Sequence, residues 1–353
     1  MKPKPLPAIA PRVIAWQRVH GRSHLPWQGH RDPYRVWLSE VMLQQTQVAT
    51  VLAYYARFVE RFADVGALAA ADLDAVLAAW SGLGYYSRAR NLHACAQAVV
   101  RDHGGRFPQT SRELACLPGI GRSTAAAIAA FCFGERAAIL DGNVKRVLTR
   151  VLGDAADLSV AANERALWAR AEALLPATDI EAYTQGLMDL GASVCSTRAP
   201  QCLLCPLNDV CVAARSGTPE RYPVKQRRLV RGTREHVWLL LEWRSRVWLL
   251  RRPATGIWAG LWSLPEFESP AAFDAATAGW PGSGETLPSF THTLTHLDWT
   301  LHPVHWRLPD RSPPAWVGAL VADWPAGSWM ALPEARAAGL PAPLRRLLAS
   351  RFR

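Results

Sequence analysis

Four cysteines with the spacing Cys195-x6-Cys202-x2-Cys205-x5-Cys211 are the most specific chemical pattern in the sequence. Thiolates are soft ligands, and a set of four holds either a structural zinc ion or an iron–sulfur cluster. Zinc sites usually use two short Cys-x2-Cys pairs, whereas only the middle pair is that close here. The other cysteines stand alone in helix-like segments, so we predict no disulfide framework and a reducing compartment.

A glycine-rich turn spans Leu117 to Thr124 and separates two helix-like segments. Gly119 and Gly121 permit a tight hairpin, and a new helix is expected to begin near Ser123. Backbone N–H groups at such a helix start can face a phosphate. The turn therefore predicts a helix-hairpin-helix element that contacts a nucleic-acid backbone.

Two carboxylates stand where they can do chemistry. Asp141 lies just ahead of a helix-like segment, where an aspartate is ordinarily an N-cap. Glu40 lies one helical turn from Trp37 and Gln44, among apolar residues. Most helical glutamates are solvated, but desolvation would raise the pKa of Glu40 until it holds a proton near neutral pH. A proton donor together with an anion can break a bond that leaves a positively charged sugar.

Helices must position these residues, and apolar residues at three- and four-residue spacings predict an all-α domain over residues 1–215, which includes the cysteine loop 195–211. Turn formers and a basic run predict a linker over 216–232. Short runs rich in Val, Trp and Leu, separated by Pro and Gly, predict an α+β domain over 233–353. The fold class is thus multi-domain, with a small sheet in the second domain.

The charge balance favours a negatively charged partner. The chain of 353 residues has a formal net charge of +11, which makes nucleic acid the first candidate. Half of the residues are hydrophobic, so the chain can bury large cores. The sequence lacks a long uncharged apolar run, and we therefore expect no membrane partner and a cytoplasmic protein.

These patterns occur together with Leu25-Pro26-Trp27, the segment Val36 to Val48 and the segment Gly82 to Leu92. In this combination the chain resembles the adenine DNA glycosylase family of the endonuclease III superfamily over residues 12–215. The resemblance implies a [4Fe–4S] cluster on the four cysteines. It also implies excision of adenine mispaired with 8-oxoguanine or guanine in double-stranded DNA, by a bacterial base-excision-repair enzyme that acts as a monomer.

The resemblance assigns roles to single residues. Glu40 would protonate N7 of an extruded adenine, and Asp141, assisted by Asn143, would stabilise the oxocarbenium ion. Gln45 and Tyr85 match residues that fill the space left when a base is flipped out. A solvated glutamine and a core tyrosine are the alternatives at those two positions. The walls or hydrogen-bond donors of the adenine pocket would be Leu25, Trp27 and Gln185, with a core role as the alternative for Trp27. DNA contacts would come from Gly119, Gly121 and Ser123.

The second domain resembles the Nudix-like module that such enzymes use to recognise 8-oxoguanine, most clearly over residues 255–265. The family's Phe-Ser-His reading loop appears here as Leu294-Thr295-His296. Thr295 keeps a hydroxyl that can bond to the oxidised base, whereas Leu294 replaces an aromatic ring. The sequence has no Nudix box with its glutamates after a glycine, so we expect no pyrophosphohydrolase activity.

Two other functions stay open at this point. Endonuclease III, a bifunctional pyrimidine glycosylase and lyase, carries a Schiff-base lysine within the hairpin pattern where this chain has Ser123. A hydroxyl cannot form an imine, which disfavours a lyase, although Lys145 is near enough in sequence to permit weak activity. A cluster-bearing DNA damage sensor without chemistry is the second alternative, and the presence of Glu40 and Asp141 argues against it.

Overall fold

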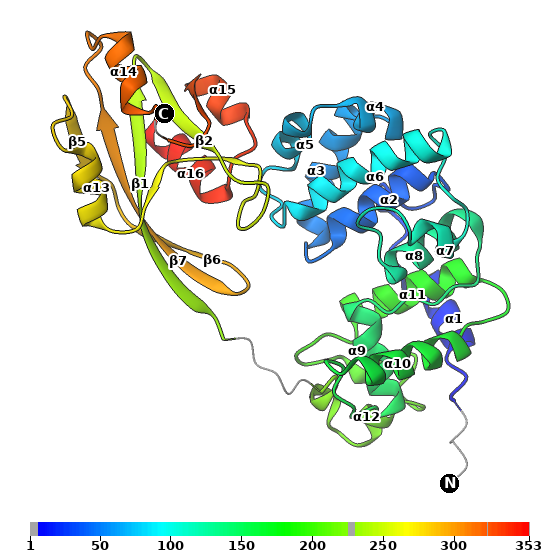
Figure 1. Cartoon of the computed structure of the whole chain (residues 1–353). Coiled ribbons are helices and arrows are strands. Elements are labelled where there is room, and N and C mark those ends of the chain that lie inside the picture. Colours follow the sequence, from blue (N-terminus) through cyan, green and yellow to red (C-terminus); the bar gives the residue numbers. More distant parts are fainter. Residues whose placement is uncertain (1–5, 225–229, 323, 353) are drawn as a thin grey trace. The chain divides into compact units, whose positions relative to one another are not determined.

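The structure is a computed structural model that describes residues 6–224, 230–322 and 324–352 (Figure 1). The chain forms two compact units. The helical unit comprises Met1–Ala70 and Asn91–Arg228, and the sheet unit comprises Ala71–Arg90 and Leu229–Arg353. Residues 71–90, which the sequence assigns to the helical domain, thus group with the C-terminal part of the chain. The predicted linker 216–232 includes residues 225–229, which lie outside the described residues.

Capping residues define the start of α2 and the ends of α8 and α9 in the helical unit. Asp32 accepts the N–H of Tyr34 at the start of α2, and Gly134 and Gly153 end α8 and α9 in left-handed conformations, with φ of 69° and 64°. The helices that belong wholly or mainly to this unit are α1 (Ala10–His20), α2 (Pro33–Leu43), α3 (Val48–Arg61), α4 (Val65–Ala70), α6 (Ser87–His103), α7 (Ser111–Leu114), α8 (Arg122–Phe133), α9 (Gly142–Leu152), α10 (Ala161–Ala173), α11 (Ile180–Ser193) and α12 (Val212–Arg215).

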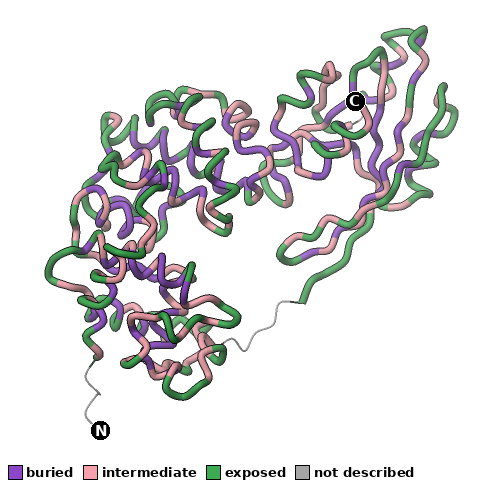
Figure 2. Tube along the Cα trace, turned by 180° about the vertical axis from the view of Figure 1, so that it is seen from behind, coloured by how far each residue is buried: buried purple, intermediate pink, exposed green. Residues whose placement is uncertain are grey.

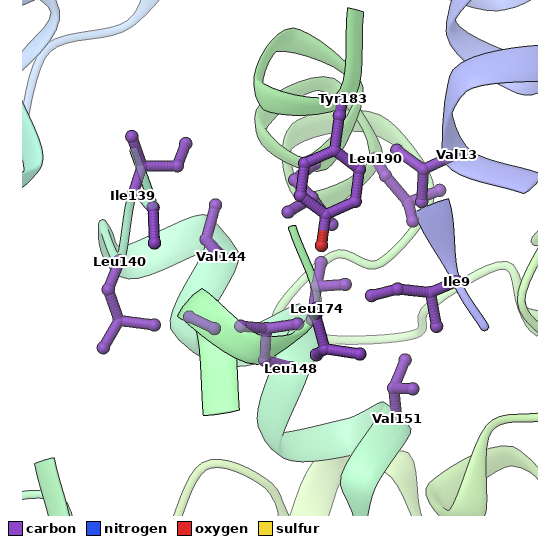
Figure 3. Close-up of a cluster of buried hydrophobic side chains, with 14 of the residues drawn as sticks. Ile9, Val13, Ile139, Leu140, Val144, Leu148, Val151, Leu174, Tyr183 and Leu190 are labelled. Carbon is purple, nitrogen blue, oxygen red and sulfur yellow. The ribbon is translucent and has the colours of Figure 1, made fainter. Parts of the chain in front are cut away.

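One core cluster of the helical unit holds α1, α9 and α11 together (Figure 3). Val144, Leu148 and Val151 lie on one face of α9 at helical spacing, and each is at most 3% exposed. The segment before α9 contributes to the same cluster, because its Ile139 and Leu140 are also buried. The residue that follows them, Asp141, is therefore held by buried neighbours on both sides.

The sheet unit contains one mixed sheet with the path β3-β2-β1-β7-β5. The central strands β1 and β7 pair in parallel, and the remaining pairs are antiparallel. Additional strands extend it, since β4 pairs with β1, β6 with β7 and β8 with β2. The strands are β1 (Gly232–Trp243), β2 (Arg246–Arg251), β3 (Trp262–Ser263), β4 (Glu266–Phe267), β5 (Ser283–Thr286), β6 (Phe290–Thr293), β7 (Leu297–Arg307) and β8 (Gly327–Ala331).

Helices cover both faces of this sheet, as Figure 1 shows. Residues 237–241 of β1 are buried without interruption, which is the pattern of a strand covered on both sides (Figure 2). Val237, Leu239 and Leu241 share a cluster with Phe273 of α13 and Val317 of α14. The helices of the sheet unit are α5 (Leu73–Trp80), α13 (Pro270–Thr277), α14 (Pro314–Leu320), α15 (Leu332–Ala337) and α16 (Ala342–Arg351). The predicted α+β character of this domain is confirmed.

Helix α5 and the loop after it are fastened to the C-terminal residues by hydrogen bonds. The hydroxyls of Ser81 and Tyr86 both donate to the carbonyl oxygen of Leu340, each over 2.9 Å. Arg345 donates to the carbonyl of Ser81 over 2.7 Å, and Arg251 forms an ion pair with Asp74. Within the described residues, every helix is too short or too polar to cross a membrane.

Candidate active site

A groove of about 2020 Å³ opens on the helical unit. It is bordered by the loop between α1 and α2, the end of α2, and the first residues of α8 and α9, together with α11. The structure brings together most of the residues that the sequence predicts for catalysis and base binding. Those that line the groove are Leu25, Trp27, Glu40, Gln45, Ser123, Asp141, Asn143 and Gln185.

Glu40 lies near the end of α2, where its neighbours are largely apolar. Trp37, Leu38 and Val41 are each at most 5% exposed, while Glu40 itself is partly buried in the groove wall. Burial, together with a smaller contribution from the negative charge of Asp141, raises the pKa of Glu40 from 4.5 to about 7. The predicted upward shift is thus confirmed, and Glu40 can hold and release a proton near neutral pH.

Asp141 is the N-cap of α9, and it also faces the groove. Its Oδ1 accepts the backbone N–H of Val144 over 2.8 Å. Burial raises the pKa of Asp141, whereas the N–H groups of Val144 and Asn143 and the charges of Arg146 and Lys145 lower it. These donors favour the anion, so the cap that fixes the carboxylate in place also stabilises its charge.

Ser123 connects the hairpin to this aspartate. Its hydroxyl oxygen accepts the N–H of Leu140, the residue before Asp141, over 3.0 Å. The hairpin turn itself needs glycine at one position, because Gly119 has φ of 73° and an added Cβ would lie 2.5 Å from Cβ of Asn91. Gly121 is the N-cap of α8. Neither glycine lines the groove.

Leu25 and Trp27 form a rigid part of the groove wall, since they are 6% and 7% exposed. Trp27 contacts the ring of Tyr55 edge-on at 5.1 Å between centroids. The core and pocket interpretations of Trp27 are therefore compatible. Gln45, by contrast, is exposed between α2 and α3 with φ of 55°, an uncommon conformation that the surrounding turn must enforce.

Sequence reasoning missed Arg146, which connects the α9 aspartate helix to the cysteine loop. Its guanidinium donates to Oδ1 of Asn143 over 2.7 Å, to the carbonyl of Gly191 over 2.6 Å and to the carbonyl of Cys195 over 2.7 Å. Helices α9 and α11 approach closely here, because a Cβ on Gly191 would lie 2.6 Å from Cβ of Asn143.

Arg150 is a second missed residue, and it is only 2% exposed. It lies one helical turn beyond Arg146 and donates to the carbonyls of Ser196 and Thr197 over 2.7 and 3.1 Å. It also donates to Sγ of Cys195 over 3.3 Å. The sequence signal that could have identified Arg150 is a charged residue on the apolar face of a helix. Such a residue can be buried only if several acceptors bond to it.

The four loop cysteines carry free thiols, of which Cys211 is buried and the others are partly buried. Burial raises the pKa of Cys205 to about 12, and the charges of Cys195, Cys211 and Cys202 contribute to this rise. The thiols therefore lie close enough to influence one another. No set of three or more metal-binding side chains at ligand spacing occurs among the residues that the structure describes.

The remaining predicted residues lie in the sheet unit. Thr295 and His296 are exposed in the hairpin turn between β6 and β7. Tyr85 is 46% exposed with φ of 48°, and its hydroxyl lies 3.1 Å from Oγ1 of Thr295. Two residues that are far apart in the sequence thus form one polar contact.

Comparisons with known proteins agree with this architecture. Residues 38–172 match the family described as HhH-GPD superfamily base excision DNA repair protein, and residues 236–350 match the NUDIX domain. The chain is 33% identical to an adenine DNA glycosylase of Buchnera aphidicola over 343 residues, which covers 95% of each chain. It is 42% identical to the human adenine DNA glycosylase over 57% of this chain and 38% of the human one.

A solved structure of a thermostable thymine-DNA glycosylase is 28% identical, with a TM-score of 0.53 over 59% of this chain and 95% of that one. The predicted fold class, a helical glycosylase-type domain followed by a Nudix-like domain, is therefore confirmed.

Proposed function

This chain belongs to the adenine DNA glycosylase family, and we propose that it removes adenine paired with 8-oxoguanine or guanine from double-stranded DNA by hydrolysis of the N-glycosidic bond. The observation that carries the proposal is the pairing, in one groove, of Glu40, whose pKa is about 7, with a capped and partly buried Asp141. A flipped-out nucleotide can enter a groove of this volume.

Glu40 is the general acid of the proposed reaction. It donates its proton to N7 of adenine, which turns the base into a neutral leaving group when the C1′–N9 bond breaks. Asp141 stabilises the oxocarbenium ion on the sugar, and Asn143 supports it from the same turn. Water then adds to C1′, and its released proton returns to Glu40. The products are adenine and an abasic site.

The enzyme is proposed to be monofunctional, that is, without strand cleavage through an imine. The hydroxyl of Ser123 cannot form an imine, and it already accepts the N–H of Leu140. Lys145 lines the groove, but its ammonium forms an ion pair with Glu164 at 2.5 Å. A lysine engaged in this ion pair is poorly placed to attack a sugar aldehyde.

Lesion recognition is proposed for Tyr85, Thr295 and His296. The hydroxyl contact between Tyr85 and Thr295 supports a shared role, because one oxidised guanine can bond to both groups. Removal of either hydroxyl, in Tyr85→Phe or Thr295→Ala, should then lower the preference for 8-oxoguanine over guanine. The two losses should not add in the double variant. Additive losses would contradict a shared role.

A [4Fe–4S] cluster on Cys195, Cys202, Cys205 and Cys211 is proposed as the cofactor. Four soft thiolates on one loop fit its chemistry, and the buried guanidinium of Arg150 supplies a compensating positive charge. The cluster would stabilise the conformation of the cysteine loop, whereas the hydrolysis would be carried out by the groove residues. We further propose that the hairpin with Gly119 and Gly121 binds the phosphate backbone of duplex DNA, favoured by the net charge of +11, and that Gln45 fills the space left by the flipped base. We propose that the enzyme acts as a cytoplasmic monomer.

The test is a single-turnover assay on duplexes with one adenine opposite 8-oxoguanine, guanine or thymine, read as strand breaks with and without alkali. Breaks that appear only after alkali, fastest opposite 8-oxoguanine, are expected. Breaks without alkali would favour the pyrimidine-glycosylase-like lyase reaction. Loss of all breaks in protein that still binds the duplex would contradict an enzyme function and favour a damage sensor.

A further inference from the structure

Asp189 is a carboxylate of α11 that lies behind the groove wall. It is 2% exposed and is absent from the residues that line the groove. Both of its oxygens accept hydrogen bonds from Arg22, which lies in the same loop as Leu25 and Trp27. The backbone N–H of Arg22 donates to Oδ2 over 2.9 Å, and its guanidinium Nε donates to Oδ1 over 2.7 Å.

Gln185 stands one helical turn before Asp189 on α11 and does line the groove. Its amide nitrogen Nε2 donates to Oδ1 of Asp189 over 3.0 Å. A carboxylate in an ion pair with arginine can only accept hydrogen bonds. The amide of Gln185 must therefore turn its NH₂ end toward Asp189, and its carbonyl oxygen is the end left for a ligand in the groove. The sequence-based assignment of Gln185 as a possible donor to adenine is replaced by that of an acceptor.

An acceptor at this place complements the proton that Glu40 holds. The Hoogsteen edge of adenine presents N7 as an acceptor and the N6 amino group as a donor. A protonated Glu40 can donate to N7, while the carbonyl oxygen of Gln185 can accept from N6. Guanine and hypoxanthine carry an oxygen at C6. This oxygen and the Gln185 oxygen are both acceptors, so they would repel each other instead of forming a hydrogen bond.

We propose that Asp189, held by Arg22, is a positioning residue that fixes the Gln185 carbonyl oxygen toward the base and so restricts release to purines with an amino group at C6. This inference rests on the proposed function. It adds a determinant of base specificity that touches neither substrate nor reacting atoms. A freely rotating amide could satisfy either C6 substituent, so the selectivity requires the fixed carboxylate.

The test compares the wild type with Asp189→Asn on duplexes that place adenine or hypoxanthine opposite 8-oxoguanine, in single turnover. Asparagine can donate as well as accept, so it no longer dictates the orientation of Gln185. We expect the adenine-to-hypoxanthine rate ratio to fall about tenfold, a size typical for one lost polar discrimination. Comparison of ratios between variants cancels the different intrinsic lability of the two nucleosides.

Asp154→Asn is the matched control, because Asp154 is also largely buried in an ion pair with an arginine, Arg170, but is not among the residues that line the groove. The control should keep the wild-type ratio. In a Gln185→Ala background, Asp189→Asn should leave the ratio unchanged, since the group through which it acts is gone. The pH dependence set by Glu40 should be the same in all variants.

The outcomes distinguish the proposed glycosylase function from the positioning role of Asp189. A wild type that releases no base would remove the proposed function itself. A wild type that prefers adenine, with an Asp189→Asn variant whose two rates fall equally, would overturn the positioning role and leave a structural one. If Asp189→Asn does not fold, Arg22→Lys replaces it as the test, because lysine keeps the positive charge but lacks the planar guanidinium that bonds to Asp189. The adenine-to-hypoxanthine rate ratio should then also fall, and an unchanged ratio would count against the proposal.

Discussion

The raised pKa of Glu40 predicts that Glu40→Gln inactivates the enzyme and stabilises it in the same experiment. At its ordinary pKa of 4.5, only about one glutamate in 300 would carry a proton at pH 7, whereas at a pKa of about 7 roughly half do. Glutamine has the shape of the protonated acid but no proton to give. Single-turnover adenine release should therefore fall by about 10²–10⁴-fold, the range of general acid catalysis.

The stability change follows from the direction of the same pKa shift. The pKa of Glu40 is higher in the folded protein than in the unfolded chain, so folding favours the protonated form. The stability linked to this proton is fully present below pH 4.5 and is lost as the pH rises through 7. Glu40→Gln does not lose it. The difference in unfolding free energy between the variant and the wild type should therefore increase by about 2 kcal/mol, in favour of the variant, from pH 5.5 to pH 8.

Thermal melts of both proteins at the two pH values measure this increase, which corresponds to about 3 °C in Tm for a chain of 353 residues. Glu60→Gln, on an exposed position of α3, is the control for the loss of a negative charge. A gap between variant and wild type that does not change with pH would refute the assignment of a buried acid at Glu40. Normal adenine release by the variant would refute its catalytic role.

Three further changes test other parts of the site. Asp141→Asn should lower single-turnover base release by about 10²–10³-fold, because the charge that stabilises the oxocarbenium ion is lost. Duplex binding and the melting temperature should stay nearly unchanged, because asparagine is an equally good N-cap. Base release and duplex binding are measured on the same preparation of the variant. Gly119→Ala should cost about 1–3 kcal/mol of stability, since its φ is 73° and its added Cβ would meet Asn91. Gly121→Ala is the control for stability, because the space around its added Cβ is open, and equal losses of stability would contradict this explanation. Duplex binding by Gly119→Ala, measured by fluorescence anisotropy, should weaken as well. Arg150→Met should leave the carbonyls of the cysteine loop without their donor, and the loop should then hold less of the proposed [4Fe–4S] cluster, measured as visible absorbance per protein. A variant that holds as much cluster as the wild type would show that the loop does not depend on Arg150.

Much of the site could be predicted from the sequence because its residues lie in short local patterns. Glu40 has apolar neighbours on its own helix, and Asp141 precedes a segment whose buried face repeats at helical spacing. The hairpin glycines are likewise readable, since only a special backbone conformation explains Gly119. The groove then brings Glu40 and Asp141 together from two different helices.

The residues that escaped prediction depend on partners far along the chain. A single arginine or aspartate in a helix is usually solvated, and nothing near Arg150 or Asp189 in the sequence shows the acceptors or donors that let them be buried. The acceptors of Arg150 begin 45 residues later, and Arg22 is 167 residues from Asp189. The grouping of residues 71–90 with the sheet unit escaped for the same reason, because its contacts with Leu340 and Arg345 span most of the chain.

That grouping means that the polypeptide passes between the two units three times, after Ala70, after Arg90 and again after Arg228. A cut in the predicted linker would therefore leave helix α5 covalently in the N-terminal fragment while Ser81 and Tyr86 still bond to Leu340 of the C-terminal one. The two fragments should consequently copurify after such a cut. Conversely, a protein truncated at residue 228 would expose the face of Leu77 that packs against Gly260 and Gly339. The sheet unit is therefore incomplete without residues 71–90, so a fragment that begins at the linker would lack the partners of Leu340.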